Sequence, residues 1–489
     1  MKNTEIERVA REKRRQKLLD NNGNPYPARV DRSHTCGQVL KDFKALSKKG
    51  VNVSVVGRIR SIRSHGGSMF IHVEDESAQL QLFVRKDILG EKQFTKLKNT
   101  ADVGDFLEAV GKPYITKRGE KSILAEKSRI ISKTLEPLPE KWHGLSDVEI
   151  RYRKRYLDLI VNYDVKEIFK KKCTMISALR SFLDKENFIE VETPVLHPIP
   201  GGAIARPFIT HHNALDSDFY LRVAPELYLK RLIIGGYERV YEIARCFRNE
   251  GMDHSHNPEF TQVEFYAAYM DYKELMKLTE RLLSHIVKKV NGSLQLTYQN
   301  NLIDFSPPYD RISFIDAINK YSKVSITSKT TENELKAILK RHNISVDKTW
   351  GRGEMLDEIL KKLVRPNLLK PTFVHRYPIE LSPLAKKTED DDKYVERFQL
   401  FCGGKELTNA FSEINDPIDQ EERFKNQDEN RKKGSDEFHR IDADFLEALS
   451  HGMPPTAGFG MGLDRLANIL TDTHSIKEVI FFPTLKPKT

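Results

Sequence analysis

The sequence predicts an α+β protein in which a small N-terminal β-barrel precedes a larger domain of strands and helices. Short runs of β-branched and aromatic residues, punctuated by glycines, fill residues 51–139. A proline-stiffened stretch at 135–140 then reads as a linker. Beyond it, strand-like segments alternate with segments of helical spacing. Three parts follow from these observations: residues 1–48, 49–140 and 141–489.

Composition narrows the class of protein. The chain has 489 residues, of which 39% are hydrophobic and 31% charged, as in soluble globular proteins of roughly two to four domains. No window approaches the roughly 20 apolar residues of a membrane-spanning helix, and no apolar signal segment follows the basic N-terminus. We therefore expect a cytoplasmic protein without a membrane partner.

Charge and cysteine content leave the partner open. The formal net charge of +10 fits a polyanionic partner such as nucleic acid, but also an ordinary soluble surface. The four cysteines lie far apart without a C-x-x-C pair, so neither a disulfide framework nor a structural zinc site is indicated.

The N-terminal segment, residues 1–48, begins with a predicted basic helix over residues 4–19, which ends at the Asn-Gly-Asn-Pro run of residues 22–25. Charged residues crowd this helix. It is either a solvated surface helix or an arm that touches RNA phosphates, and the sequence favours neither.

Residues 49–140 predict five strands in about 90 residues, for which an OB-fold is the leading candidate. Such barrels can present aromatic and polar side chains to unstacked bases. Phe70, Gln81 and Phe83 have suitable chemistry, although strand residues of this kind usually belong to a core, and without further context we expect core positions. The predicted strands cover residues 53–59, 69–73, 80–84, 106–110 and 122–124.

In the larger domain, residues 141–489, a helical pattern from Ile176 passes through Asn187 into an extended run that ends at Pro194. Glu190 and Glu192 alternate there with apolar residues. This pattern predicts a long helix followed by a strand with one polar face.

A second stretch, residues 240–266, predicts an antiparallel hairpin around a polar loop of about ten residues. Arg248 ends one strand and Glu264 lies on the other. The planar guanidinium fork can hold a carboxylate or phosphate through two hydrogen bonds. Because Arg, Glu, His, Asn and Phe crowd one loop, we interpret it as a ligand site and not as a solvated hairpin tip.

In a third stretch, residues 457–470, three glycines alternate along an extended segment before Asp464 and Arg465 begin a helix. Glycine alternation clears one face of a strand, so a flat ligand can lie against the backbone. The G-x-G-x-G spacing lacks the βαβ context of a dinucleotide fingerprint, which excludes a Rossmann site.

These three stretches resemble, in order and chemistry, the three motifs of class II aminoacyl-tRNA synthetases. The matching residues are Pro194, the run Phe247-Arg248-Asn249-Glu250 with its loop, and Gly-Leu-Asp-Arg465. Further runs resemble the lysyl member of subclass IIb, so the resemblance covers nearly the whole chain. They are His143-Gly-Leu, Arg151-Tyr-Arg-Lys-Arg-Tyr-Leu-Asp-Leu159, Gly201-Gly-Ala-Ile-Ala-Arg206, Ala224-Pro-Glu226-Leu-Tyr-Leu-Lys-Arg and Asn409-Ala-Phe-Ser-Glu413-Ile-Asn-Asp.

The resemblance implies a mixed, mainly antiparallel catalytic sheet flanked by helices, an anticodon-binding OB-fold, and a homodimer built across the first motif. It also implies a reaction. L-Lysine and ATP give lysyl-adenylate and pyrophosphate, and lysine then passes to the 3′ end of tRNA(Lys). Magnesium is the implied cofactor.

The resemblance assigns roles to residues of the nucleotide and metal sites. Arg248 would grip the lysine carboxylate and the α-phosphate, and Arg465 the γ-phosphate, so both are catalytic candidates. Glu406 would hold magnesium. Where the family usually has a second glutamate, this chain has Gln399, a weaker ligand. The other implied ATP contacts are Phe260 under the adenine, Glu250, His256 and Asn257.

The implied lysine pocket needs carboxylates at two depths, because the substrate carries two ammonium groups. Gly202 and Glu226 would meet the α-amino group, whereas Glu264, Tyr266 and Glu413 would line the deep end, with Asn409 and Phe411 on the wall. In the barrel, Phe70 and Gln81 match as a stacking platform and a base reader. No acidic reader is securely matched, and Glu126 is the nearest candidate.

Residues 291–393 show helical patterns over 332–340 and 355–363 and are expected to pack as an insertion beside the active site.

Two alternative functions are weighed against the synthetase interpretation. A catalytically silent paralogue would be expected to lose the paired arginines, and an enzyme that lysylates proteins would be expected to lack the barrel. This chain has both features, which lowers the weight of either alternative.

Overall fold

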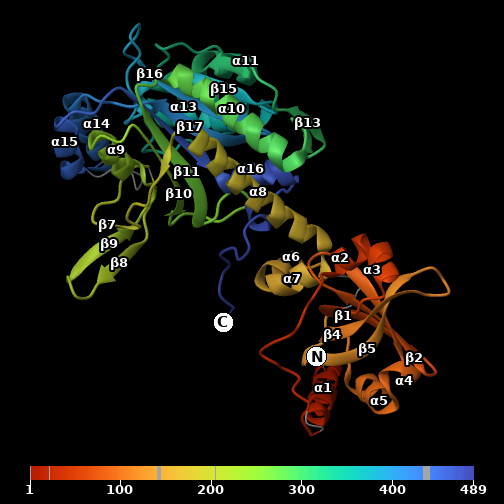
Figure 1. Ribbon diagram of the computed structural model, residues 1–489. Coiled ribbons are helices and arrows are strands. Elements are labelled where there is room, and N and C mark those ends of the chain that lie inside the picture. Colours follow the sequence, from red (N-terminus) through yellow and green to blue (C-terminus); the bar gives the residue numbers. More distant parts are fainter. Residues whose placement is uncertain (1, 21–22, 140–144, 204, 433–440, 489) are drawn as a thin grey trace. The chain divides into compact units, whose positions relative to one another are not determined.

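The computed structural model describes residues 2–20, 23–139, 145–203, 205–432 and 441–488. The chain divides into two compact units, Met1–Gly144 and Leu145–Thr489, each with its own core (Figure 1). The boundary lies close to the end of the predicted linker. His143 and Gly144, which belong to one of the matched runs, lie outside the described residues, as does Ile204.

The first unit is a closed five-stranded barrel with the strand order β1-β2-β3-β5-β4. The five predicted strands are confirmed, and the OB-fold is the matching topology. Apolar side chains of alternate strand residues fill the interior, whereas the intervening residues face outward. The strands are β1 (Val53–His65), β2 (Ser68–Glu74), β3 (Gln79–Arg85), β4 (Phe106–Ile115) and β5 (Lys121–Ser132).

Five helices accompany the barrel: α1 (Lys2–Asp20), α2 (Cys36–Lys41), α3 (Phe43–Lys49), α4 (Lys86–Leu89) and α5 (Glu91–Thr100). The predicted N-terminal helix is therefore present. Two of its arginines are used within the unit: Arg11 donates to the Val103 carbonyl and Thr134, and Arg14 donates to Asp102. These contacts favour a surface helix packed on the barrel.

The second unit is built on an eight-stranded sheet in the order β14-β15-β16-β17-β18-β11-β10-β6. Among the described strands of this sheet, the two edge pairs, β14 with β15 and β10 with β6, are parallel and the others are antiparallel. The mixed, mainly antiparallel α+β architecture is thus confirmed. The strands are β6 (Ile189–Glu190), β10 (Arg239–Phe247), β11 (Glu259–Ala268), β14 (Asp310–Ser313), β15 (Thr372–Pro378), β16 (Tyr394–Cys402), β17 (Lys405–Ser412) and β18 (Thr456–Gly462).

One face of this sheet is covered by α8 (Tyr163–Lys185), α10 (Tyr272–Asn291) and α16 (Leu463–Thr471), which share one apolar core with the strands (Figure 1). The opposite face carries the polar side chains described below. The sheet therefore separates a dry layer from a face on which a ligand can lie.

The remaining described elements surround this framework. A small sheet has the order β7-β9-β8, and β12 pairs with β13. These elements are β7 (Leu196–His197), β8 (Ile209–His212), β9 (Ser217–Leu221), β12 (Gln295–Tyr298) and β13 (Asn301–Asp304), with α6 (Val148–Arg153), α7 (Arg155–Val161), α9 (Glu226–Ile234), α11 (Phe314–Ser322), α12 (Glu332–Arg341), α13 (Arg352–Ile359), α14 (Pro417–Lys432) and α15 (Ala443–Ser450).

The segment 291–393 contains both predicted helices, as α12 and as α13 continued by a π-turn over Leu360–Val364. It also contains β14 and β15, which pair within the main sheet. The helical part of this segment is thus bounded by strands of the main sheet.

The predicted strand after Asn187 is shorter than expected. Asn187 has a φ of 62°, which turns the chain out of α8, but β6 spans only two residues. Ile189 and Glu190 are both exposed, so the prediction of one apolar and one polar face is wrong. The physical reason is that β6 lies at the sheet edge and makes only a two-residue pairing with β10.

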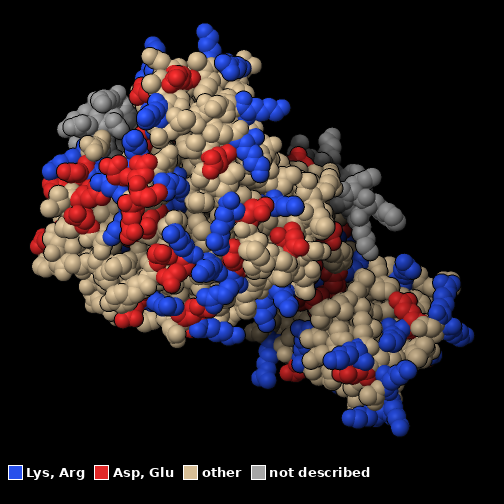
Figure 2. All heavy atoms as spheres, turned by 90° about the horizontal axis from the view of Figure 1, so that it is seen from above, with Lys and Arg blue, Asp and Glu red and all other residues tan. Residues whose placement is uncertain are grey.

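None of the described helices is long and apolar enough to cross a membrane. On the face shown in Figure 2, basic and acidic side chains are interspersed over the larger unit. The net positive charge is therefore not gathered into a single patch on that face.

Candidate active site

The candidate site is built from side chains that share one face of the sheet. Residues paired across antiparallel strands point to the same side. Glu264 of β11 pairs with Gly460 of β18, which pairs with Asn409 of β17, which pairs with Gln399 of β16. One row thus brings together residues that are far apart in sequence.

A second row lies two residues away on the same face. Tyr266 pairs with Gly458, Gly458 with Phe411, and Phe411 with Arg397. In each row, the residue between the β11 and β17 side chains is a glycine of β18. The alternating glycines predicted from the sequence therefore form a floor without side chains of its own, which is open at Gly460, whereas Tyr266 and Glu413 fill the space over Gly458.

A cavity of about 370 Å³ lies over this floor. All predicted nucleotide-site, lysine-site and metal-site residues line it, with the single exception of Glu413. These are Gly202, Glu226, Arg248, Glu250, His256, Asn257, Phe260, Glu264, Tyr266, Gln399, Glu406, Asn409, Phe411 and Arg465.

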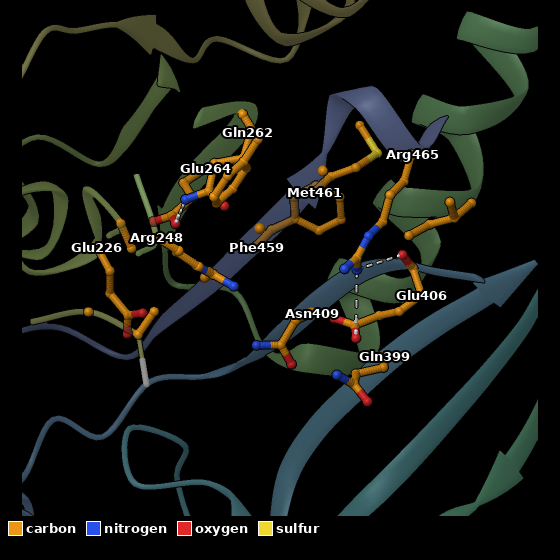
Figure 3. Close-up of a pocket in the computed structure, with 18 of the residues that line it drawn as sticks. Glu226, Arg248, Gln262, Glu264, Gln399, Glu406, Asn409, Phe459, Met461 and Arg465 are labelled. Carbon is orange, nitrogen blue, oxygen red and sulfur yellow. Dashed lines mark hydrogen bonds and ion pairs between the residues drawn. The ribbon is translucent and has the colours of Figure 1, made fainter. Parts of the chain in front are cut away.

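Arg248 is the cation at one end of the glycine floor (Figure 3). Its guanidinium lies over the Phe260 ring, 5.0 Å from the centroid. Its Nε is buried and has no hydrogen-bond partner among the described residues. A buried donor of this kind is costly unless a ligand accepts from it, so the geometry suits a bound anion.

Arg465 projects into the same cavity from the first turn of α16, where it approaches the Glu406 carboxylate to 3.9 Å (Figure 3). The preceding residue anchors this turn. Asp464 accepts hydrogen bonds from the Thr261 backbone N–H at 3.0 Å and from Lys172 at 2.6 Å. Because Asp464 ties α16 to β11 and α8, the direction of Arg465 is fixed.

Three buried carboxylates, Glu226, Glu264 and Glu413, form the acidic end of the site. An internal cation lies among them. Lys230, on the same helix as Glu226, donates to it at 2.7 Å and forms an ion pair with Glu413. Glu413 lies against Gly458 and Tyr266, and its other oxygen has no hydrogen-bond partner among the described residues.

Burial and mutual charge control the protonation of these groups. Burial raises the pKa of Glu264 well above its usual range, and the charge of Glu226 raises it further. Burial alone would lower the pKa of Lys230, but Glu226 and Glu413 outweigh it and raise the pKa. Burial thus outweighs the charges of Lys230, Arg248 and Arg397 and raises the pKa of all three acids, so a bound ammonium group would favour their ionised forms.

Glu264 is held on both oxygens. Gln262 donates to one of them at 2.7 Å (Figure 3), and the Tyr266 hydroxyl donates to the other at 3.3 Å. Burial, together with the surrounding acids, raises the pKa of Tyr266 well above its usual range, so this hydroxyl stays protonated and can donate.

The polar loop after β10 carries the remaining predicted nucleotide contacts. His256 is exposed, and its Nδ1 lies 2.9 Å from Asp253. Asn257 donates to the Glu259 carbonyl at 2.6 Å, whereas its own buried Oδ1 has no partner among the described residues. Asn257 can therefore accept a hydrogen bond from a ligand.

The predicted metal ligands differ in availability. Glu406 presents a carboxylate to the cavity beside Arg465. Gln399 also lines the cavity, but its Oε1 accepts a 2.5 Å hydrogen bond from Tyr377. Within the described ranges no cluster of three or more His, Cys, Asp or Glu residues forms a protein-only metal site. Magnesium held by one carboxylate together with substrate phosphates fits this donor set.

Three residues that were not assigned from the sequence contact residues that were, and two of them, Gln262 and Arg397, line the cavity. Gln262 holds Glu264, Lys230 holds two acids, and Arg397 donates to the Asn409 side chain at 2.8 Å. Gln262 follows Phe260 and precedes Glu264 with strand periodicity, which was a usable signal. The i, i+4 spacing of Glu226 and Lys230 on α9 was a usable signal for one of its ion pairs, whereas Glu413 is brought to Lys230 only by the fold.

On the barrel, Phe70 and Phe83 face outward and stack on each other with centroids 4.8 Å apart. Tyr114 extends this ladder, 5.5 Å from Phe83. The expectation that these phenylalanines are core residues is therefore wrong, because the barrel interior is filled by the alternate residues of β2 and β3.

Gln81 is buried, as expected for a core position, and its amide is engaged within the barrel. It donates to Glu120 at 2.6 Å and accepts from Ser122 at 2.8 Å. Glu120 lies in the β4–β5 loop beside this face, whereas Glu126 bonds Asn52. Glu120, and not Glu126, is the carboxylate next to the predicted readers.

The two units together define a class of protein: a synthetase-type sheet with an arginine-lined cavity and an OB-fold. The family model for class II tRNA synthetases (D, K and N) matches residues 147–486, and that for an OB-fold nucleic acid binding domain matches residues 53–131.

The lysine–tRNA ligase of Thermoanaerobacter pseudethanolicus is 47% identical over 486 residues, covering 99% of this chain and 96% of the relative. That of Bacillus subtilis is 45% identical over 485 residues, covering 98% and 97%. The chain therefore belongs to the lysine–tRNA ligase family of class II tRNA synthetases.

The glycine floor gives a prediction. A Cβ on Gly458 would come within 1.9 Å of Glu413 and 2.5 Å of the Tyr266 ring, whereas a Cβ on Gly460 meets nothing closer than 3.7 Å. We expect Gly458→Ala to destabilise the larger unit by about 1–3 kcal/mol through overpacking, with Gly460→Ala as the matched control. Thermal unfolding midpoints measure the difference, and equal midpoints for the two variants would contradict the packing.

Proposed function

We propose that this chain activates L-lysine with ATP and transfers it to the 3′ end of tRNA(Lys). The observation that carries the proposal is that one cavity holds a guanidinium whose buried Nε has no hydrogen-bond partner among the described residues and two carboxylates, Glu226 and Glu264, whose pKa values are raised by burial. The near-full-length similarity to lysine–tRNA ligases supports the same reaction.

The proposed chemistry joins the lysine carboxylate to the α-phosphorus of ATP and releases pyrophosphate. The attacking carboxylate is ionised at neutral pH, so no general base is needed. Arg248 would hold carboxylate and phosphate together and offset charge that develops at phosphorus, while Phe260 offers a ring on which adenine can stack. Arg465 would hold the terminal phosphates.

Specificity would follow from charge. Lysine brings two ammonium groups, and Glu226 and Glu264 present carboxylates to the cavity. Glu413 is screened from the cavity and would act through Lys230 and Tyr266, so we propose it as a residue that sets the charge of the deep end. An acidic or amide substrate would leave these carboxylates uncompensated.

Magnesium would be held by Glu406 together with ATP phosphates, and when bound it would neutralise phosphate charge. Gln399 would contribute only through the lone pair that Tyr377 leaves free. Because Gln399 stands where the family usually has a second glutamate, the magnesium site would depend more strongly on the phosphates of ATP.

In the barrel, the ladder of Phe70, Phe83 and Tyr114 would stack unpaired anticodon bases. Glu120 and Gln81 supply acceptors and donors beside it. We propose Glu120 as the acidic reader that the sequence left unmatched. A homodimer across β6 and its flanking residues is part of the same proposal and agrees with the exposure of Ile189.

The role of Arg248 is tested first. Arg248→Ala should lower lysine-dependent ATP–pyrophosphate exchange by about a hundredfold or more, because a preorganised cation at the reacting centre is lost. Arg245→Ala is the matched control, since Arg245 lies near the end of β10, just before Arg248 in the chain, in an exposed ion pair with Glu259. Near-normal exchange in Arg248→Ala would remove this residue from the mechanism.

Glu413 provides a second test. Glu413→Gln should raise the KM for lysine about tenfold or more while the KM for ATP stays nearly constant, because a buried partner of Lys230 is lost. Glu422→Gln, an exposed change on α14, serves as the control. Equal rises in both KM values would contradict a role in the lysine pocket.

The barrel is tested separately. Phe70→Ala should weaken tRNA(Lys) binding by about 1–3 kcal/mol through loss of one stacking surface, without altering lysine-dependent exchange. Filter binding and exchange measure the two effects. Unchanged tRNA affinity would show that this ladder is not the anticodon platform.

A further inference from the structure

A second cavity of about 380 Å³ lies beside the first in the larger unit. The two share four lining residues: Ser255, His256, Glu406 and Arg465. Arg465 therefore stands in the wall between them. The second cavity continues away from the glycine floor, on the side opposite the acidic cluster.

Two further cations line this cavity. Arg365 comes from the turn after α13, and Lys405 begins β17. Neither forms an ion pair with an acid within the part of the chain that the structure describes. Among the described residues, Lys405 donates to two neutral oxygens, Asn468 Oδ1 at 3.2 Å and the His474 carbonyl at 3.3 Å.

The fold forces these cations together. The β16–β17 hairpin turns through Gly403 and Gly404, both with positive φ, and their N–H groups donate to the carbonyls of Leu369 and Leu368. These bonds fasten the hairpin to the segment that carries Arg365. Burial, with the charges of Arg465 and Arg365, lowers the pKa of Lys405 to about 8.

Histidines close the cavity. His254 and His474 stack with their ring centroids 5.1 Å apart, and both line it. Their ring nitrogens add donors to a site that already holds three cations and one carboxylate, Glu406. The balance of charge and donors suits a compact polyanion.

The proposed reaction releases a compact polyanion, pyrophosphate, and its geometry gives the direction in which this product leaves. In an in-line displacement at phosphorus, the carboxylate oxygen bonds to the α-phosphorus as the bond to the bridging oxygen breaks, and that oxygen leaves with the electron pair. The attacking group lies toward Glu226 and Glu264. The leaving group must depart on the opposite side, toward Arg465.

We propose that the second cavity binds pyrophosphate as it leaves the reaction centre, through Arg365 and Lys405 together with Arg465. This site deepens the proposed function and rests on it for the source of the ligand. It would draw the product out of the reaction centre, and in the reverse reaction it would be the entry site for pyrophosphate.

The test is a calorimetric titration with sodium pyrophosphate in magnesium-containing buffer. The full chain is first saturated with a non-hydrolysable lysyl-adenylate analogue, which fills the first cavity. We expect Arg365→Gln and Lys405→Gln each to raise the pyrophosphate Kd fivefold or more, with the KM for ATP changed less than twofold. Lys362→Gln, an exposed change near Arg365, is the control.

Two results would overturn the proposal: a pyrophosphate Kd unchanged in both variants, or a KM for ATP that rises by the same factor as the Kd. If the analogue itself fails to bind, the proposed function fails instead. Titration of the unliganded chain and its two variants with pyrophosphate then still tests the cavity, because it needs no activity.

Discussion

The structure depends on charged groups that are held, partly out of water, on one open face of the large sheet. Three buried carboxylates share the internal cation Lys230, and Arg248, whose charge also acts on Glu264, is half-buried with an Nε that has no hydrogen-bond partner among the described residues. Burial outweighs these cations and raises the pKa of all three acids. Such an arrangement is unfavourable without a ligand. It becomes favourable when a ligand that carries one carboxylate and two ammonium groups binds there.

The rest of the larger unit keeps this arrangement rigid. The helices behind the sheet give it an apolar core, and Asp464 ties the helix that carries Arg465 to a neighbouring strand. Arg397, Gln262 and Tyr266 then hold the side chains of the site in place by hydrogen bonds. Preorganisation of this kind is what a reaction without a general base requires, since positioning and electrostatics carry the catalysis.

Sequence patterns located the elements well where the pattern is local. Five barrel strands, the hairpin around the polar loop and the glycine strand before α16 are all present, because strand alternation and turn residues act over a few positions. Patterns failed where long-range pairing decides, as at the edge strand β6. Phe70 and Phe83 illustrate the same limit: an aromatic in a strand faces inward or outward according to register, which the barrel closure sets.

By itself, the sequence determined the order of motifs, the chemistry available in each and the family resemblance that joins them. Only the tertiary structure decided how these groups pair. It placed Glu413 behind the cavity in an ion pair with Lys230 and put Glu120 rather than Glu126 beside Gln81. It also set Lys405 near Arg465, where Lys405 forms no ion pair with an acid of the described residues. The physical reason is that charge interactions depend on distance and burial, and both arise when strands remote in sequence become neighbours.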